Sequence, residues 1–157
     1  MENSLKQEFT RRISQCNRGE LIVIMYDIVF AYIEEAKKAH EHKDYEGYKM
    51  AIKKAQKSID SLMHGLDFKY NLSRDLHKLY VYAKNCLAKA IYQNRLDGIY
   101  EAEKVLKSLY ASFCEVAKTD TSGPLMRNTQ QVYAGMTYGR NTLIENCYED
   151  NHRGFFV

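Results

Sequence analysis

A single proline, Pro124, stands in the chain of 157 residues. Proline breaks the interior of a helix because it lacks a backbone N–H donor and its ring clashes with the preceding turn. Residues 1–123 carry no such breaker, so a long helical body is permitted. A sandwich of short strands joined by proline-containing turns is disfavoured. At this length we expect one domain with a real core and no need of disulfide or metal support.

The first helix of that body is expected to begin after Asn17. Asn17 can cap the free backbone amides, and Glu20, three residues later, can reach back to complete a capping box. The run at residues 21–25 is apolar enough for a buried strand. The cap before it and the charged continuation through residues 34–42 favour a helix that extends to about residue 42.

Three further stretches place apolar residues at alternating steps of three and four, the spacing of one helical face. Asp44 is the predicted N-cap of the second helix and Asp97 that of the fourth. Because the links are short, neighbouring helices must run antiparallel. The predicted fold is all-α, an antiparallel up-down-up-down four-helix bundle with an N-terminal arm and a C-terminal extension. The three faces are Tyr48, Ile52, Ala55, Ile59, Leu62 and Leu66; Leu72, Leu76, Leu79, Ala83, Cys86 and Ala90, widened by Leu87 and Ile91; and Ile99, Ala102, Leu106, Leu109, Phe113 and Val116.

These patterns also set the domain boundaries. Residues 17–118 form the bundle, and residues 1–16 form an arm, an amphipathic turn or two with an apolar residue at every fourth position. Residues 119–157 form an extension with too many apolar side chains to stay in water, so we expect it to pack on the bundle. The apolar residues of the arm are Leu5, Phe9 and Ile13.

Inside the extension, the sequence predicts two local structures. Pro124 is suited to the first turn of a short helix that ends near Gly135. Residues 142–145 fit a second capping box.

Charge and hydropathy exclude several classes of partner. The chain carries 23 basic and 20 acidic side chains, a net charge of +3. We interpret the densest basic row as a solvated face, so we expect neither nucleic acid nor an anionic membrane as a partner. The longest apolar run, residues 21–33, is interrupted by Asp27 and is shorter than the ~20 residues that span a bilayer. The basic row is Lys49, Lys53, Lys54 and Lys57.

The cysteines and the N-terminus bear on the cellular compartment. No apolar signal segment is visible at the start of the chain. The four cysteines are far apart and form no C-x-x-C pair, so we expect reduced thiols and a cytoplasmic location. They are Cys16, Cys86, Cys114 and Cys147.

Motifs for catalysis and metal binding are largely missing. The sequence has no nucleophile elbow, phosphate-binding loop or dinucleotide-binding loop. One Glu-x-x-His pair lies at residues 149–152, whereas helical di-metal sites need two. The metal-like residues at 40–44 fall on different faces of a helix. Cys16 has no histidine placed beside it by the sequence, so an ordinary thiol is expected there. We therefore expect no enzyme activity, no metal and no cofactor.

Tyrosine is unusually common, with 13 residues against no tryptophan. Tyrosines on or beside the apolar faces are expected to be core residues with a hydroxyl at the rim. The alternative is that some of them line a groove for a partner, because tyrosine offers a large amphipathic contact area. These tyrosines are Tyr26, Tyr32, Tyr48, Tyr80 and Tyr82.

Four motifs follow one another along the chain. They are ISQCNRGELIVIMYD at residues 13–27, KAQKSIDSL at 54–62, LYVY at 79–82 followed by LAKA at 87–90, and EAEKVL at 101–106. In this order and spacing, over residues 9–118, the chain resembles the FliS family, the flagellin-specific export chaperones.

The resemblance implies a cytoplasmic four-helix bundle that binds the disordered C-terminal segment of flagellin. Holding that segment prevents premature polymerisation and delivers the subunit to the flagellar export apparatus. The chain would be a monomer or a weak homodimer, without nucleic acid or membrane insertion. The alternative is an adaptor or regulator bundle with a different flagellar or regulatory client. The expected partner-binding residues are Phe9, Ile13, Ile22, Met25, Tyr26, Gln56, Ile59, Tyr80 and Tyr82.

The chain departs from the family pattern at three positions. Asn17-Arg18 replaces the usual Ser/Thr-Pro before the first helix, and Phe113 stands where a tryptophan is common. Phe9 is the nearest match to the tyrosine of the family's arm. The extension from Thr119 has no counterpart in the pattern.

The arm and the extension suggest a hypothesis about regulation. Both would cover apolar surface that flagellin later claims, so that binding becomes a competition. The alternative is a permanently docked strap that enlarges the core. Deletion of residues 119–157 separates the two, since loss of a competitor tightens binding and loss of a strap destabilises the bundle.

Overall fold

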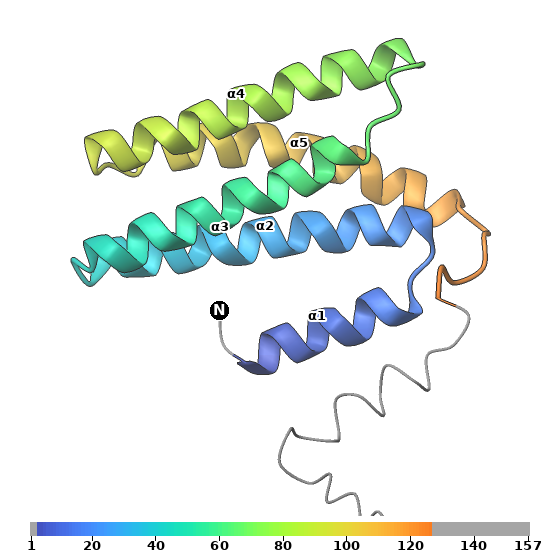
Figure 1. Cartoon of the computed structure of the whole chain (residues 1–157), viewed down its shortest axis with the longest axis horizontal. Helices are drawn as coiled ribbons and strands as arrows, with labels where there is room; N and C mark the ends of the chain where they lie inside the picture. Colours follow the sequence, from blue (N-terminus) through green and yellow to red (C-terminus); the bar gives the residue numbers. More distant parts are fainter. Residues whose placement is uncertain (1–2, 127–157) are drawn as a thin grey trace, which may run out of the picture. The chain divides into compact units, whose positions relative to one another are not determined.

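Helices make up most of the computed structural model, which describes residues 3–126. No strand occurs within these residues, which confirms the predicted all-α class. The helices are α1 (Asn3–Gln15), α2 (Arg18–Glu41), α3 (Tyr45–His64), α4 (Asn71–Gln93) and α5 (Asp97–Thr119) (Figure 1).

The helices α2 to α5 form an antiparallel bundle. Each packs against the next along the chain, and α5 closes the ring by packing against α2. Figure 1 shows α2 and α3 side by side along most of their length, with α4 and α5 paired beside them. The up-down-up-down order predicted from the short links is confirmed, and α1 lies outside the ring, against α2.

Two of the predicted helix caps are confirmed and one is wrong. The Asn17 side chain accepts from the Glu20 N–H at 2.8 Å, and Glu20 Oε2 accepts from the Asn17 N–H at 3.0 Å, completing the capping box. Asp44 caps α3 by accepting from the Gly47 N–H at 2.9 Å.

The predicted cap at Asp97 is the error. Leu96 occupies the cap position of α5 with a backbone already in the helical region, and Asp97 is the first residue of the helix. Leu96 packs against the core, which fixes the start of α5. The Asp97 carboxylate instead pairs with Arg95 at 2.8 Å. A negative charge in the first turn still interacts favourably with the helix dipole.

Three tyrosines are fully buried in the core, and each hydroxyl has a partner. The hydroxyl groups of Tyr26 on α2 and Tyr80 on α4 hydrogen-bond to each other at 2.7 Å. The Tyr48 hydroxyl donates to the carbonyl oxygens of Arg95, at 2.9 Å, and Ala90, at 3.1 Å, tying α3 to the link between α4 and α5. Buried hydroxyls that lack such partners would destabilise the fold, so these bonds help to specify the packing.

The apolar face predicted for α4 is wrong at two of its residues. Leu72 is 68% exposed and Leu79 is 39% exposed, whereas the neighbouring Tyr80 is buried. The rest of the predicted face packs inward, and Tyr80 takes the place of Leu79 in the core, where its hydroxyl reaches Tyr26. On α5, Val116 at the end of the predicted face is also exposed.

The arm forms a longer helix than the predicted turn or two. Phe9 of α1 is 6% exposed and forms a small core with Cys16 and Ile24. This burial against α2 stabilises a helix that would be marginal in isolation at 13 residues. Other side chains packed on this small core are Leu5, Ile13, Leu21, Ile28 and Ala31.

Two points remain, one on membrane spans and one on the predictions made for the C-terminal extension. None of the helices described is long and apolar enough to cross a membrane. The helix predicted to end near Gly135 and the capping box at residues 142–145 lie outside the described residues.

Replacement of Gly98 by alanine tests the close packing of α4 and α5. A Cβ atom at Gly98 would overlap the Cys86 carbonyl oxygen and approach Ala90 Cβ to 3.2 Å. We expect Gly98→Ala to lower the free energy of unfolding by about 1–3 kcal/mol, measured by urea denaturation. Gly65→Ala is the control, since the nearest atom to its Cβ is 3.5 Å away. Equal stability of the two variants would contradict this packing.

Candidate partner-binding surfaces

The predicted partner-binding residues do not share one surface. Tyr26, Ile59 and Tyr80 are buried in the main core and present no surface. Phe9 and Ile13 belong to the small core between α1 and α2, while Ile22 and Met25 are partly buried against the main core. The Gln56 side chain donates to the Lys84 carbonyl oxygen at 3.1 Å. Tyr82 is 49% exposed.

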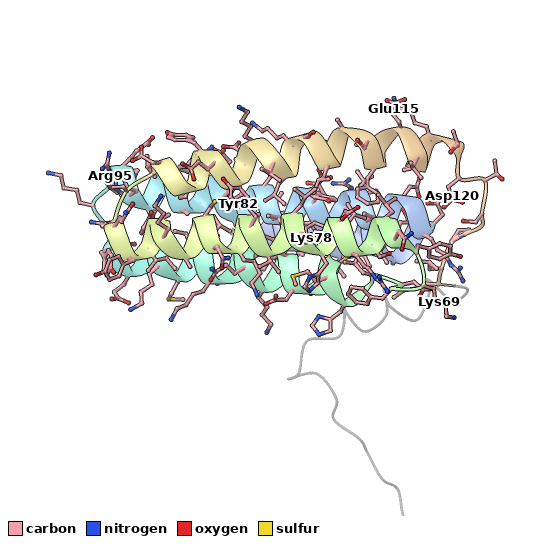
Figure 2. All side chains as sticks on the ribbon, turned by 90° about the horizontal axis from the view of Figure 1, so that it is seen from above. Lys69, Lys78, Tyr82, Arg95, Glu115 and Asp120 are labelled. Carbon is pink, nitrogen blue, oxygen red and sulfur yellow. The ribbon has the colours of Figure 1, made fainter. Side chains whose placement is uncertain are left out.

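Tyr82 belongs to a groove between α4 and α5. The groove has a volume of about 560 Å³, with apolar walls and a polar rim. Figure 2 shows Tyr82 on the side of α4 next to α5, one turn along from Lys78. The orientation of α4 that brings Tyr80 inward leaves Leu79 and Tyr82 at this surface. The lining residues are Leu79, Tyr82, Glu101, Lys104, Val105, Ser108 and Leu109.

The exposed apolar surface of α4 and α5 is not confined to the groove. Leu72, near the start of α4, is 68% exposed, and Val116, near the end of α5, is 60% exposed. Because the helices are antiparallel, both lie toward the same end of this helix pair. Contiguous apolar surface on a small protein is typical of an interaction site.

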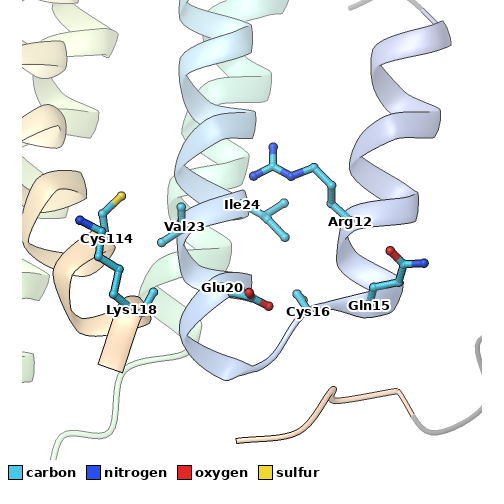
Figure 3. Close-up of a pocket in the computed structure, with 9 residues that line it drawn as sticks. Arg12, Gln15, Cys16, Glu20, Val23, Ile24, Cys114 and Lys118 are labelled. Carbon is cyan, nitrogen blue, oxygen red and sulfur yellow. The ribbon is translucent and has the colours of Figure 1, made fainter. Parts of the chain in front are cut away.

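A second pocket, of about 510 Å³, is formed by α1, α2 and the end of α5. In Figure 3, Val23 and Ile24 of α2 lie in the middle, with Arg12 on one side and Cys114 and Lys118 on the other. The lining residues are Arg12, Gln15, Cys16, Glu20, Val23, Ile24, Cys114, Ala117 and Lys118.

The segment after α5 ties the junction between α1 and α2 to the bundle. Asn17 Nδ2 donates to the Asp120 carbonyl oxygen at 3.1 Å, and the Gly19 N–H donates to Asp120 Oδ2 at 2.9 Å. Further along, the Leu125 N–H donates to the Cys16 carbonyl oxygen at 3.0 Å. Residues 120–126 therefore act as a structural strap across this junction.

An ion-pair cluster fixes α2 against α5 elsewhere in the bundle. Lys37 Nζ lies 2.7 Å from Glu103 Oε2, and Lys107 Nζ lies 2.8 Å from Glu103 Oε1. Burial disfavours the charged form of Glu103, but its hydrogen bonds to Lys107 and Lys37 outweigh that effect and lower its pKa. The cluster is satisfied within the bundle, so we assign it to structure.

Comparison with known proteins now identifies the family. The family model described as flagellar protein FliS matches residues 1–120. The chain belongs to the FliS family. This is a family of flagellar chaperones for flagellin. The matched residues cover all five helices and end at Asp120. A search of curated proteins found no match to this chain.

Within the part of this FliS-family chain that is described, nothing resembles a metal centre. No three histidine, cysteine, aspartate or glutamate side chains gather there to hold an ion. The rings of His40 and His42 hydrogen-bond to different carbonyl oxygens, those of Asn94 and Lys38. Burial raises the pKa of the Cys16 thiol, in agreement with the ordinary thiol expected there.

Of the residues that line the α4/α5 groove, the sequence analysis names only Tyr82 as a candidate binding residue. Leu79 and Leu109 were assigned to core faces, and Val105 was not singled out. Helical spacing alone cannot choose between Leu79 and Tyr80 as the inward residue, because both are apolar enough. The buried hydroxyl pair makes that choice, and a tyrosine on each of two helices that lie diagonally across the bundle was the available signal.

The strap predicts a specific dependence of stability on pH. Hydrogen bonds from Ser122 and Gly19 lower the pKa of Asp120. The stabilisation from this carboxylate is thus complete above the unfolded value of about 3.9 and is lost as pH falls through the lower folded pKa. We expect Asp120→Ala to be less stable than the wild type at pH 7, by a margin that shrinks in acid.

Urea denaturation between pH 3 and 7 measures this margin. Thr121→Ala, an exposed neighbour without a carboxylate, should match the wild type at every pH. A margin that stays constant down to pH 3 would show that Asp120 acts through its shape and not its charge.

Proposed function

We propose that this protein binds the disordered C-terminal segment of flagellin in the cytoplasm, prevents its premature polymerisation and delivers it to the export apparatus. The observation that carries the proposal is the α4/α5 groove, an exposed apolar surface around Leu79 and Tyr82 on a chain of the FliS family. A chaperone of this kind needs a binding surface and no catalytic group.

The physical fit is that of a helix in a groove. A disordered amphipathic segment can fold as it binds, burying its apolar face against a hydrophobic groove. Tyrosine and leucine walls supply contact area, while Glu101 and Lys104 at the rim can pair with polar groups of the client. The exposed Leu72 and Val116 allow the client to continue along the same two helices.

The helix α1 supports a second part of the proposal, in which the arm competes with the client. It is itself an amphipathic helix seated on α2 through Phe9 and its apolar neighbours. Its removal would uncover Ile24 and Ile28 of α2 next to the pocket shown in Figure 3. We propose that flagellin binds this surface when α1 is displaced, so that the client occupies both the α2 surface and the α4/α5 groove.

The strap refines the deletion experiment for the C-terminal extension. Residues 120–126 are bonded to the α1–α2 junction, so a deletion that begins at residue 119 would remove a structural contact. A chain that ends at Met126 keeps that contact and isolates the effect of residues 127–157. Tighter flagellin binding by this shorter chain would identify those residues as a competitor.

Calorimetry with a peptide from the last ~40 residues of flagellin tests the groove. We expect one-to-one binding with a negative heat-capacity change, the mark of buried apolar surface. Tyr82→Ala should weaken binding by about tenfold, because the truncation removes most of the contact area that this side chain offers to the client. Tyr92→Ala is the matched control, since Tyr92 is 92% exposed and lies outside the groove.

Two results would contradict the proposal. Equal affinities of the two tyrosine variants would place the client elsewhere on the bundle. Absence of binding by the wild type and by the chain ending at Met126 would favour an adaptor or regulator with another client.

Substitution of Phe9 tests the competition by α1. Phe9→Ala removes the main apolar contact of α1 with α2, so the open state becomes more populated. We expect the flagellin peptide to bind about three- to tenfold more tightly, because less free energy is needed to displace α1. Glu8→Ala, an exposed neighbour on α1, is the control and should bind as the wild type does. Weaker binding by Phe9→Ala would mean that the arm contacts the client directly.

A further inference from the structure

An ion pair joins the arm to the first bundle helix. Arg12 Nη2 of α1 lies 2.7 Å from Asp27 Oδ2 of α2. Both side chains are partly buried, Arg12 at 35% exposure and Asp27 at 23%. A charge pair in such a position is screened less than one on the open surface.

Asp27 is set among apolar residues of the surface that α1 covers. Ile24 and Ile28 stand on the same face of α2, and both pack against α1. Asp27 also interacts with Tyr110 of α5. Burial and this interaction raise the pKa of Tyr110 to about 12, so it stays protonated at neutral pH. Asp27 thus belongs to α2 and has a neighbour on α5 as well as its partner on α1.

Displacement of α1 would leave this carboxylate without its cation. A helix that covered Asp27 with apolar atoms alone would remove water from the carboxylate and offer no charge in return, which is costly. A helix with lysine or arginine at the same place would restore the pair. A charge in an apolar surface thus discriminates between partners mainly by penalising the wrong one.

We propose that Asp27 selects a lysine or arginine in the helical segment that replaces α1. The arm gives the pattern of that segment, apolar residues at positions i, i+4 and i+8 and a basic residue at i+7, as in Leu5, Phe9, Ile13 and Arg12. The inference rests on the proposed function in one respect, that the replacing segment belongs to flagellin.

The first arm of the test uses peptides and does not involve flagellin. The host is the full-length chain with Phe9→Ala and Arg12→Ala, which loosens its own α1 and frees Asp27. The probes are a capped peptide of residues 3–15, the same peptide with Arg12→Ala, and a matched control with Arg11→Ala. Arg11 is the exposed neighbour of Arg12, so its loss changes net charge equally without touching Asp27.

We expect the native and Arg11→Ala peptides to bind alike and the Arg12→Ala peptide about fivefold more weakly, as for a partly buried ion pair. Adding Asp27→Asn to the host should abolish this difference. A difference below twofold, its persistence with Asp27→Asn, or failure of the native peptide to bind would each overturn the proposal.

The second arm separates this proposal from the proposed function. Each basic residue of the flagellin peptide is replaced by alanine, and binding is measured to the Arg12→Ala protein with and without Asp27→Asn. We expect one replacement to weaken binding about fivefold only when Asp27 is present. If flagellin fails to bind while the arm peptides discriminate, the client is wrong and the selection by Asp27 stands. If flagellin binds and no replacement depends on Asp27, the selection fails and the chaperone function stands.

Discussion

The hydrogen bond between the hydroxyl groups of Tyr26 and Tyr80 determines how the rest of the bundle is arranged. Each hydroxyl is fully buried, so each would cost about 1–3 kcal/mol if it were left without a partner. That cost fixes the rotation of α4 about its axis. Rotation of Tyr80 inward turns Leu79 and Tyr82 outward, and these two side chains form a wall of the groove beside α5. One polar contact in the core thus creates an apolar surface outside it.

The sequence predicts well whatever depends on neighbouring residues. The capping box of Asn17 and Glu20 and the cap at Asp44 are local contacts, and both form as expected. The antiparallel order follows from link length, another local property. The cap at Asp97 failed because Leu96 is anchored in the core and begins the helix one residue early, which is a tertiary effect.

The groove shows the same limit more sharply. Leu79 and Tyr80 are adjacent, and either of them fits the helical spacing of a core position. The choice depends on Tyr26, which lies 54 residues away in sequence. The strap also depends on a long-range contact, since Asp120 and Gly19, which are hydrogen-bonded, lie 101 residues apart in sequence. A groove defined by such contacts is hard to locate from one sequence, even where the fold and the family are recognised.

The helix α2 has two faces with different roles, one that packs into the main core and one that carries α1. Its inner face, with Val29 and Ile33, belongs to the main core, to which no residue of α1 contributes. Its outer face carries α1, which is tethered by a link of two residues and is therefore held beside that face at high effective concentration. Under the proposed competition, a client must displace that tethered helix, so changes in α1 would adjust the apparent affinity. Because α1 contributes no residue to the main core, such adjustment would leave the bundle itself intact.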